Sequence, residues 1–136
     1  MLKILRKGLY CALQDVGRFG YRHVGIPCSG AMDRHSFIYS NYQLGNNLNA
    51  AQLEIYGQGA VFLVLLDCIL YLAGAEVVFT VDGLIKQTSD PIAVFSGQEL
   101  CIKRVVLGTR LYIAVKGGFY NTPVMESIST LEGTHL

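Results

Sequence analysis

The stretch EVVFTVDGLI, residues 76–85, carries the clearest short-range fold signal in the chain. Apolar and β-favouring residues stand on both sides of the dipeptide Asp82-Gly83. An Asp-Gly pair between apolar flanks favours a tight turn that joins two antiparallel strands. The stretch therefore predicts a β-hairpin.

Further apolar segments continue this pattern in both directions along the chain. We predict separate strands over AAQLEIYG (50–57), AVFLVLL (60–66), CILYLAG (68–74), EVVFTV (76–81), PIAVF (91–95), ELCIKRVV (99–106) and RLYIAVKGG (110–118). The first 15 residues predict one or two short strands that are broken at Gly8. One short helix is expected over RHSFIYSNYQL (34–44), with Asp33 or Ser29 as its cap and Gly45 as its stop. The predicted fold class is all-β with one short helix, as a barrel or a sandwich.

Composition restricts the possible functions of this single 136-residue domain. Charged residues make up 15% of the chain and the net charge is +1, so nothing indicates nucleic-acid binding. The apolar run 60–75 is shorter than a membrane span and contains Asp67, so we expect no membrane segment. The four cysteines are widely spaced, which predicts reduced thiols in a cytoplasmic protein.

The stretch QDVGRFGYRHVGIPCSGAMDRHS, residues 14–36, concentrates polar side chains around glycines. Asp15 and Asp33 can move protons, and Arg18 can bind a carboxylate or phosphate through its fork of N–H groups. The alternative is a charged surface loop whose residues pair and cap turns. Ser29 lacks the GxSxG elbow of a nucleophile, so it is either a helix cap or part of a main-chain anion site.

Glu54 lies in a predicted strand, with Leu53 and Ile55 on the opposite face. If it faces inward, it is a buried carboxylate that needs a partner, which would indicate a functional role or an ion pair. If it faces solvent, it has no special role, and the pattern leaves both possibilities open. His35 and His135 have no partners at metal-ligand spacing, so we predict no metal site.

Several motifs in this order resemble one known family. They are ALQDVGRFGYRHVGIPCSGAMDRHSF (12–37), YQLGN (42–46), AAQLEI (50–55), LAGAEVVFTVDG (72–83), YIAVKGGF (112–119) and TPVMESISTLEG (122–133). Together they resemble the biotin-dependent carboxyltransferase-like proteins, which include allophanate hydrolase subunit 2 and the C-type subunit of 5-oxoprolinase. The resemblance covers essentially the whole chain.

The resemblance implies a cyclophilin-like β-barrel and a small cyclic or urea-like amide as substrate. Family members work with a B-type subunit of related fold, and often with an A-type subunit, in ATP-dependent hydrolysis of 5-oxoproline to glutamate. Relatives form the carboxyltransferase portion of urea carboxylase. ATP or biotin is thus expected at the level of the complex, and no cofactor is expected on this chain itself.

The resemblance also implies site residues. It makes them motif positions of the family. If the chain is an enzyme component, we expect catalytic roles for Asp15 and Asp33, with substrate binding by Arg18, Ser29, Gly30, Met32 and Glu54. In this interpretation Arg18 holds a carboxylate, and the main chain from Ser29 to Met32 holds an oxyanion. Asn46 is a further motif position.

Two departures from the family leave the role of the chain open. The family reads LGSRST where this chain has MESIST, so that Glu126 replaces a Gly and Ile128 replaces an Arg. Family members also continue well beyond the length of this chain. We therefore expect residues 1–136 to be an N-terminal portion that forms an incomplete half of the barrel. It would be an enzyme component, a regulatory or binding module that docks on a partner subunit, or a truncated remnant.

Overall fold

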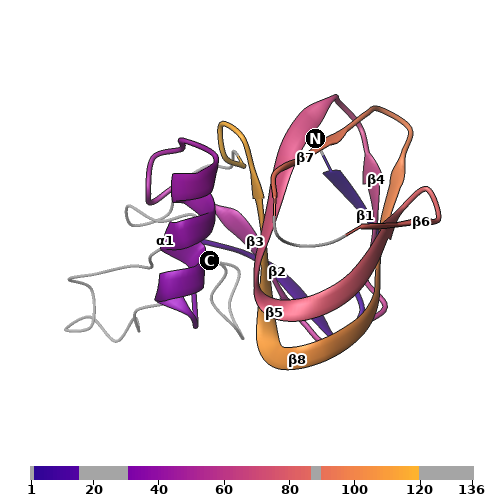
Figure 1. Ribbon diagram of the computed structural model, residues 1–136, viewed down its shortest axis with the longest axis horizontal. Coiled ribbons are helices and arrows are strands. Elements are labelled where there is room, and N and C mark those ends of the chain that lie inside the picture. Colours follow the sequence, from indigo (N-terminus) through magenta and orange to yellow (C-terminus); the bar gives the residue numbers. More distant parts are fainter. Residues whose placement is uncertain (1, 16–30, 87–89, 120–136) are drawn as a thin grey trace, which may run out of the picture.

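The computed structural model describes residues 2–15, 31–86 and 90–119, which form one curled sheet and one helix (Figure 1). The elements in chain order are β1 (Leu2–Arg6), β2 (Tyr10–Gln14), α1 (Arg34–Gln43), β3 (Gln52–Tyr56), β4 (Val61–Val64), β5 (Cys68–Val81), β6 (Leu84–Lys86), β7 (Ile92–Val94) and β8 (Glu99–Val115). The predicted class, all-β with one short helix, is confirmed. The apolar run 60–75 forms β4 and the first half of β5. Among the described helical residues, no helix has the length and apolar character needed to cross a membrane.

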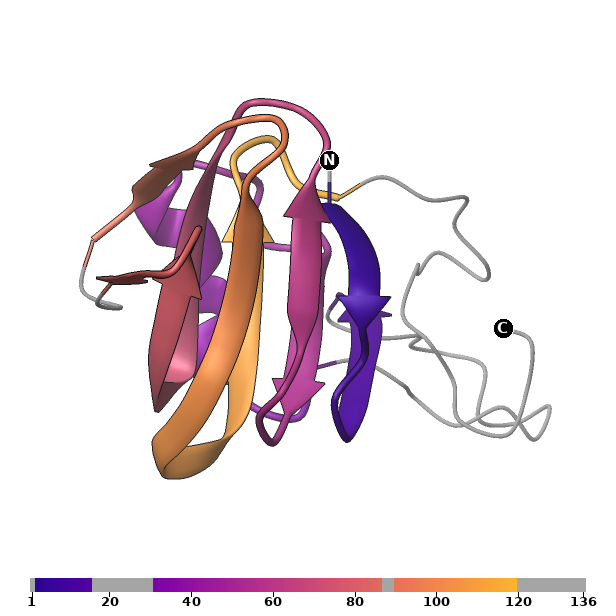
Figure 2. The same cartoon turned by 90° about the vertical axis from the view of Figure 1, so that its right-hand side faces the viewer.

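The long strand β8 organises the sheet. Along one path the strand order is β1-β4-β8-β3-β2, and β5 pairs with β8 while also carrying β6 and β7. The pairings between these strands are antiparallel. Because β5 and β8 bend together, the sheet curls around an enclosed interior, which is visible along the axis in Figure 1 and from the side in Figure 2.

The hairpin predicted at Asp82-Gly83 is present. Val81 pairs with Leu84, and the two turn residues have φ angles of 49° and 80°. Positive φ at both central residues is the geometry of a tight hairpin turn, which Asp-Gly adopts readily.

The prediction that residues 68–81 and 99–118 each contain two strands is wrong. Each region contains one long strand, β5 or β8, that bends where a break was expected. The pairing register shifts next to Gly74, whose φ is +94°, and a Cβ there would lie 2.3 Å from the Arg110 carbonyl oxygen. A Cβ at Gly108, whose φ is +90°, would lie 3.0 Å from the Cα of Ala75. The glycines therefore allow a bulge between two strands in close contact and do not end either strand.

The two faces of the sheet differ in chemistry. The interior is packed with apolar side chains, and its largest fully buried members include Phe62, Phe79, Ile102 and Ile113. On the outer face, α1 lies against β5 and β8 and buries Phe37, Ser40 and Asn41. The outer face under the helix is therefore a place where this fold buries polar side chains.

Helix α1 begins and ends as the sequence predicts. Asp33 is its N-cap, and Gly45 follows the C-cap residue Leu44 with a φ of +68°. The connection to β3 is held to the sheet by Asn46, which donates to the Val115 carbonyl (2.8 Å) and accepts from the Gly117 N–H (2.8 Å). In the described part of the chain, Asn46 therefore has a structural role.

Candidate functional site

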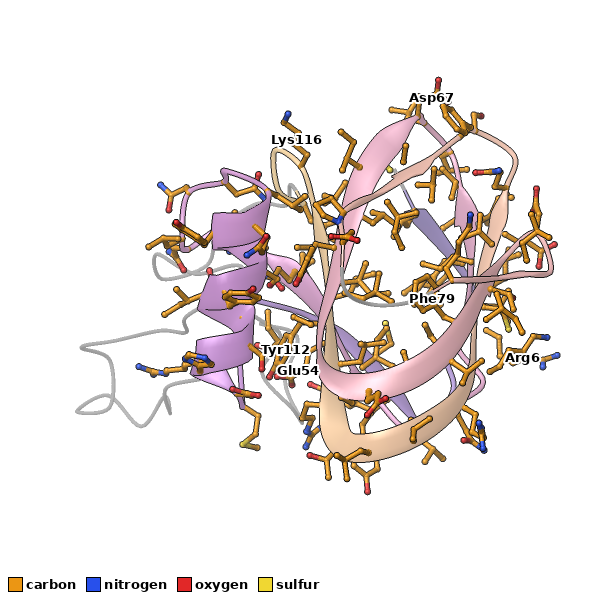
Figure 3. The ribbon with its side chains drawn as sticks, viewed as in Figure 1. Arg6, Glu54, Asp67, Phe79, Tyr112 and Lys116 are labelled. Atoms are coloured by element: carbon orange, nitrogen blue, oxygen red, sulfur yellow. The ribbon has the colours of Figure 1, made fainter. Side chains whose placement is uncertain are left out.

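Glu54 is the buried carboxylate at the centre of the candidate site. It lies on β3 between Ala12 of β2 and Tyr112 of β8, on the outer face of the sheet. Only 3% of its surface is exposed. Its Oε2 atom accepts hydrogen bonds from the Tyr112 hydroxyl (2.5 Å) and the Met32 N–H (2.8 Å). The alternative left open by the sequence is thus settled: Glu54 is buried and hydrogen-bonded under the start of α1 (Figure 3).

Three successive main-chain N–H groups attach the start of α1 to the sheet. Ala31 donates to the Asp15 carbonyl (2.9 Å), Met32 to Glu54, and Asp33 to the Tyr112 hydroxyl (2.8 Å). These bonds connect the residues on either side of segment 16–30 to β2, β3 and β8. The two ends of the polar stretch chosen from the sequence therefore meet directly beside Glu54.

Tyr112 holds the carboxylate in place from the neighbouring strand. It is fully buried, and its ring contacts Phe37 of α1 edge-on at a centroid distance of 6.3 Å. Burial, followed by the hydrogen bond to Glu54, raises the pKa of Tyr112 well above its usual value. The phenol stays protonated and donates to Glu54.

The second oxygen of Glu54 is chemically available. Both hydrogen bonds of the carboxylate use Oε2, and Oε1 accepts none from the part of the chain that the structure describes. An ionised carboxylate can accept on both oxygens, and a buried one gains from each donor it receives. Oε1 is therefore suited to an N–H group of a ligand.

Asp33 caps the helix through both of its carboxylate oxygens. Oδ1 accepts from the Ser36 N–H (3.1 Å) and Oδ2 from the Ser36 hydroxyl (2.6 Å). Partial burial acts to raise the pKa of Asp33, but the hydrogen bonds from Ser36 outweigh it, and the net pKa is lowered. A lowered pKa suits a helix cap and is the opposite of what a general acid needs at neutral pH. The catalytic role implied for Asp33 stays a prediction.

The structure brings four of the implied site residues together: Asp15, Met32, Asp33 and Glu54. Arg18, Ser29 and Gly30 lie outside the described residues, so their roles stay predictions. The Met32 N–H donates to Glu54 in this structure, and the oxyanion role expected for the main chain from Ser29 to Met32 stays a prediction. Asp15 is buried at the end of β2, where its carbonyl oxygen accepts from Ala31.

Sequence reasoning missed a group of aromatic and basic residues beside Glu54. The group consists of Tyr10, Tyr56, Arg110 and Tyr112. The signal was present in RLYIAV (110–115), where Arg110 and Tyr112 alternate with apolar residues and so share the outer face of β8.

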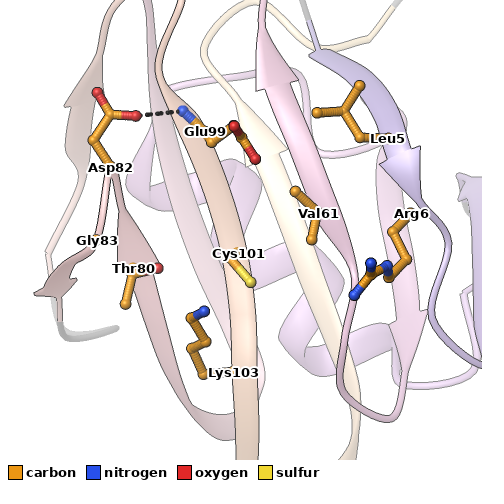
Figure 4. A pocket seen from close by; sticks show the side chains of 9 residues that line it. All are labelled: Leu5, Arg6, Val61, Thr80, Asp82, Gly83, Glu99, Cys101 and Lys103. Atoms are coloured by element: carbon orange, nitrogen blue, oxygen red, sulfur yellow. Dashed lines mark hydrogen bonds between the residues drawn. The ribbon is translucent and has the colours of Figure 1, made fainter.

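A large groove lies elsewhere on the outer face of the sheet (Figure 4), and Arg6, one of its lining residues, lies on the side of the molecule away from α1 (Figure 3). Its volume is about 480 Å³. It is lined by Leu5, Arg6, Val61, Thr80, Asp82, Gly83, Glu99, Cys101 and Lys103. Apart from Thr80, these residues are exposed or half-buried, and the charged ones among them are all exposed to solvent. We therefore place the site at Glu54. The described residues contain no group of three His, Cys, Asp or Glu side chains that could hold a metal ion.

Comparison with known proteins identifies the family. Residues 24–136 match the family model of the carboxyltransferase domain, subdomains A and B. The chain belongs to this family. It is 40% identical over 131 residues to the C-type subunit of 5-oxoprolinase from Escherichia coli, and this match covers 96% of the chain and 42% of the relative. It is 31% identical to the urea amidolyase of Lachancea kluyveri, over 94% of the chain and 7% of that protein.

Solved structures support the same assignment. The crystal structure of the Kluyveromyces lactis urea carboxylase superposes with a TM-score of 0.90 at 32% identity, covering 95% of this chain and 12% of that one. The resemblance found in the motifs is thereby confirmed, and so is the curled fold expected from it. The chain spans less than half the length of each of these relatives.

Proposed function

We propose that this chain supplies one wall of a small-amide site in an ATP-dependent amide-hydrolysing enzyme of several subunits, of the 5-oxoprolinase type. The observation that carries the proposal is Glu54, a buried carboxylate that Tyr112 and Met32 hold through Oε2. Within the described residues, Oε1 is left to accept a ligand hydrogen bond. The relatives' names agree with this class of ligand, since one belongs to a 5-oxoprolinase and another is a urea amidolyase.

The chemistry of an amide fits this arrangement. A lactam or a urea presents an N–H donor next to a carbonyl acceptor, so it needs a fixed acceptor and a fixed donor together. Glu54 Oε1 is the acceptor. The donors for the carbonyl oxygen would come from the main chain at Ser29 and Gly30, where the sequence analysis expects an oxyanion to be held. ATP use and the partner subunits belong to the assembled complex.

The proposal is tested by co-expressing the chain with its cognate A-type and B-type subunits, and measuring ATP hydrolysis that depends on 5-oxoproline. Glu54→Gln keeps the shape of the side chain but removes its charge. Because a hydrogen bond to a charged group contributes about 1.5–3 kcal/mol, we expect kcat/KM to fall roughly 10- to 100-fold. Glu99→Gln is the matched control, since Glu99 is exposed in the large groove elsewhere on the sheet and should leave turnover unchanged.

Two results would contradict an enzymatic role. A stable complex without 5-oxoproline-dependent turnover would favour the regulatory or binding module. Failure of the chain to enter any soluble complex would favour a truncated remnant. Equal turnover in wild type and Glu54→Gln would be consistent with an enzymatic role of the chain, but it would show that Glu54 does not contribute to the substrate site.

A further inference from the structure

Arg110 lies one step along the sheet from Glu54, on the same face. Tyr10, Tyr56 and Arg110 form one cross-strand row, and Ala12, Glu54 and Tyr112 form the next. Successive side chains on one face of a strand are two residues apart, which corresponds to roughly 7 Å. The guanidinium group therefore belongs to a neighbouring position of the same surface.

Two tyrosine rings hold the guanidinium group in position. Its Cζ atom lies 5.3 Å from the ring centroid of Tyr10 and 5.0 Å from that of Tyr56. Both distances are within the range of a cation–π interaction. A guanidinium group held over aromatic rings keeps its in-plane N–H groups for a planar anion such as a carboxylate. Within the described residues no ion pair or hydrogen bond uses these N–H groups, and Arg110 is half-buried.

We propose that Arg110 binds the carboxylate of a substrate whose amide N–H is accepted by Glu54, so that the site selects small amides that carry an acid group. This inference rests on the function proposed above and narrows its substrate class. The two rows are roughly 7 Å apart along the strands, a span that a small ligand with a hydrogen bond of about 2.9 Å at each end can cover. A neutral urea fills only the Glu54 half of this arrangement.

The alternative is that Arg110 only packs between the two rings. The two roles predict different effects on ligands with and without a carboxylate group. If Arg110 only packs, its loss weakens the fold and lowers the affinity for every ligand by the same factor. If it binds a carboxylate, its loss lowers the affinity only for ligands with that group. A pair of ligands that differ in the carboxylate alone distinguishes these cases.

The experiment uses 5-oxoproline and 2-pyrrolidinone, which have the same lactam ring with and without the carboxylate. Dissociation constants for the chain in its complex are measured by calorimetry for wild type, Arg110→Lys and Arg104→Lys. Arg104 is an exposed arginine on the same strand and serves as the control. Because charge-assisted bonds to a guanidinium fork contribute most of the selectivity, we expect wild type to prefer 5-oxoproline roughly 10- to 100-fold.

In Arg110→Lys this preference should fall at least several-fold, with the affinity for 2-pyrrolidinone unchanged, while Arg104→Lys behaves as wild type. Equal binding of both lactams by wild type would overturn the role of Arg110 and leave the amide site standing. An unchanged preference in Arg110→Lys, or an equal loss for both ligands, would also overturn it. If wild type binds neither lactam, the proposed function fails together with this inference.

Discussion

The Tyr112 hydroxyl group joins β8 to both β3 and the start of α1. Its removal therefore measures how much these hydrogen bonds contribute to the free energy of unfolding. In Tyr112→Phe the ring remains and its contact with Phe37 is kept, so no cavity forms. The hydrogen bond to Glu54 (2.5 Å) and the one from the Asp33 N–H (2.8 Å) are both lost. A bond to a charged group contributes about 1.5–3 kcal/mol and a neutral one about 1 kcal/mol. We therefore expect the free energy of unfolding to fall by about 2–4 kcal/mol.

The assay is urea denaturation of the purified chain, followed by circular dichroism. Tyr42→Phe is the matched control, because Tyr42 lies on α1, is 70% exposed and makes no side-chain hydrogen bond with the described residues. An exposed substitution of this kind should change the free energy of unfolding by less than about 0.5 kcal/mol.

The Tyr112–Glu54 pair can be isolated by a double-mutant cycle. Glu54→Gln is combined with Tyr112→Phe, and the non-additive part of the two free-energy changes measures their interaction. We expect a coupling of about 1–2 kcal/mol, since each substitution removes the same charged hydrogen bond. A loss below about 1 kcal/mol in Tyr112→Phe alone, or additivity of the two changes, would refute the described geometry.

Two further predictions concern the bend and the cysteines. In the same denaturation assay, Gly74→Ala should lower the free energy of unfolding by at least about 2 kcal/mol more than Gly97→Ala does. The two glycines have similar φ angles, +94° and +92°, but only a Cβ at Gly74 would meet a main-chain oxygen, at 2.3 Å. Equal losses for the two substitutions would show that the close strand contact at Gly74 has no effect on stability. Burial raises the pKa of the Cys11 thiol to about 11 despite the opposing charge of Lys7, so at mildly alkaline pH iodoacetamide should modify half-buried Cys101 before Cys11. Peptide mass spectrometry reads the order, and faster modification of Cys11 would contradict its burial.

Local signals in the sequence predicted the elements whose cause is local. The Asp82-Gly83 turn and the Asp33 cap each depend on two or three neighbouring residues, and both are present. The sequence analysis predicted one strand break after Gly74 and another between residues 106 and 110, around Gly108. Whether a glycine ends a strand or bends it depends on the partner strand, and here each glycine lies against the opposite main chain. That information is not local, so the sequence pattern could not supply it.

The site was predictable in part for the same reason. Glu54 stood out as a charged residue in an apolar strand, but its burial depends on β2 and β8 on either side and on α1 above it. Its partner Tyr112 is 58 residues away in sequence. The alternation in RLYIAV puts Arg110 and Tyr112 on one face of a strand, which identifies them as candidates. Their position beside Glu54 follows only from the pairing of β3 with β8.

The placement of Glu54 on an inner strand has a consequence for how a ligand is held. Main-chain pairing to β2 and β8 fixes its position on both sides, and Tyr112 and Met32 fix its orientation. Oε1 is therefore in place before a ligand arrives, so little conformational entropy is lost when it accepts a hydrogen bond. Arg110 lies on the adjacent row, and the two tyrosine rings likewise hold its guanidinium group in place before a ligand arrives. The sheet alone thus sets the spacing between an N–H acceptor and the donor proposed for a carboxylate.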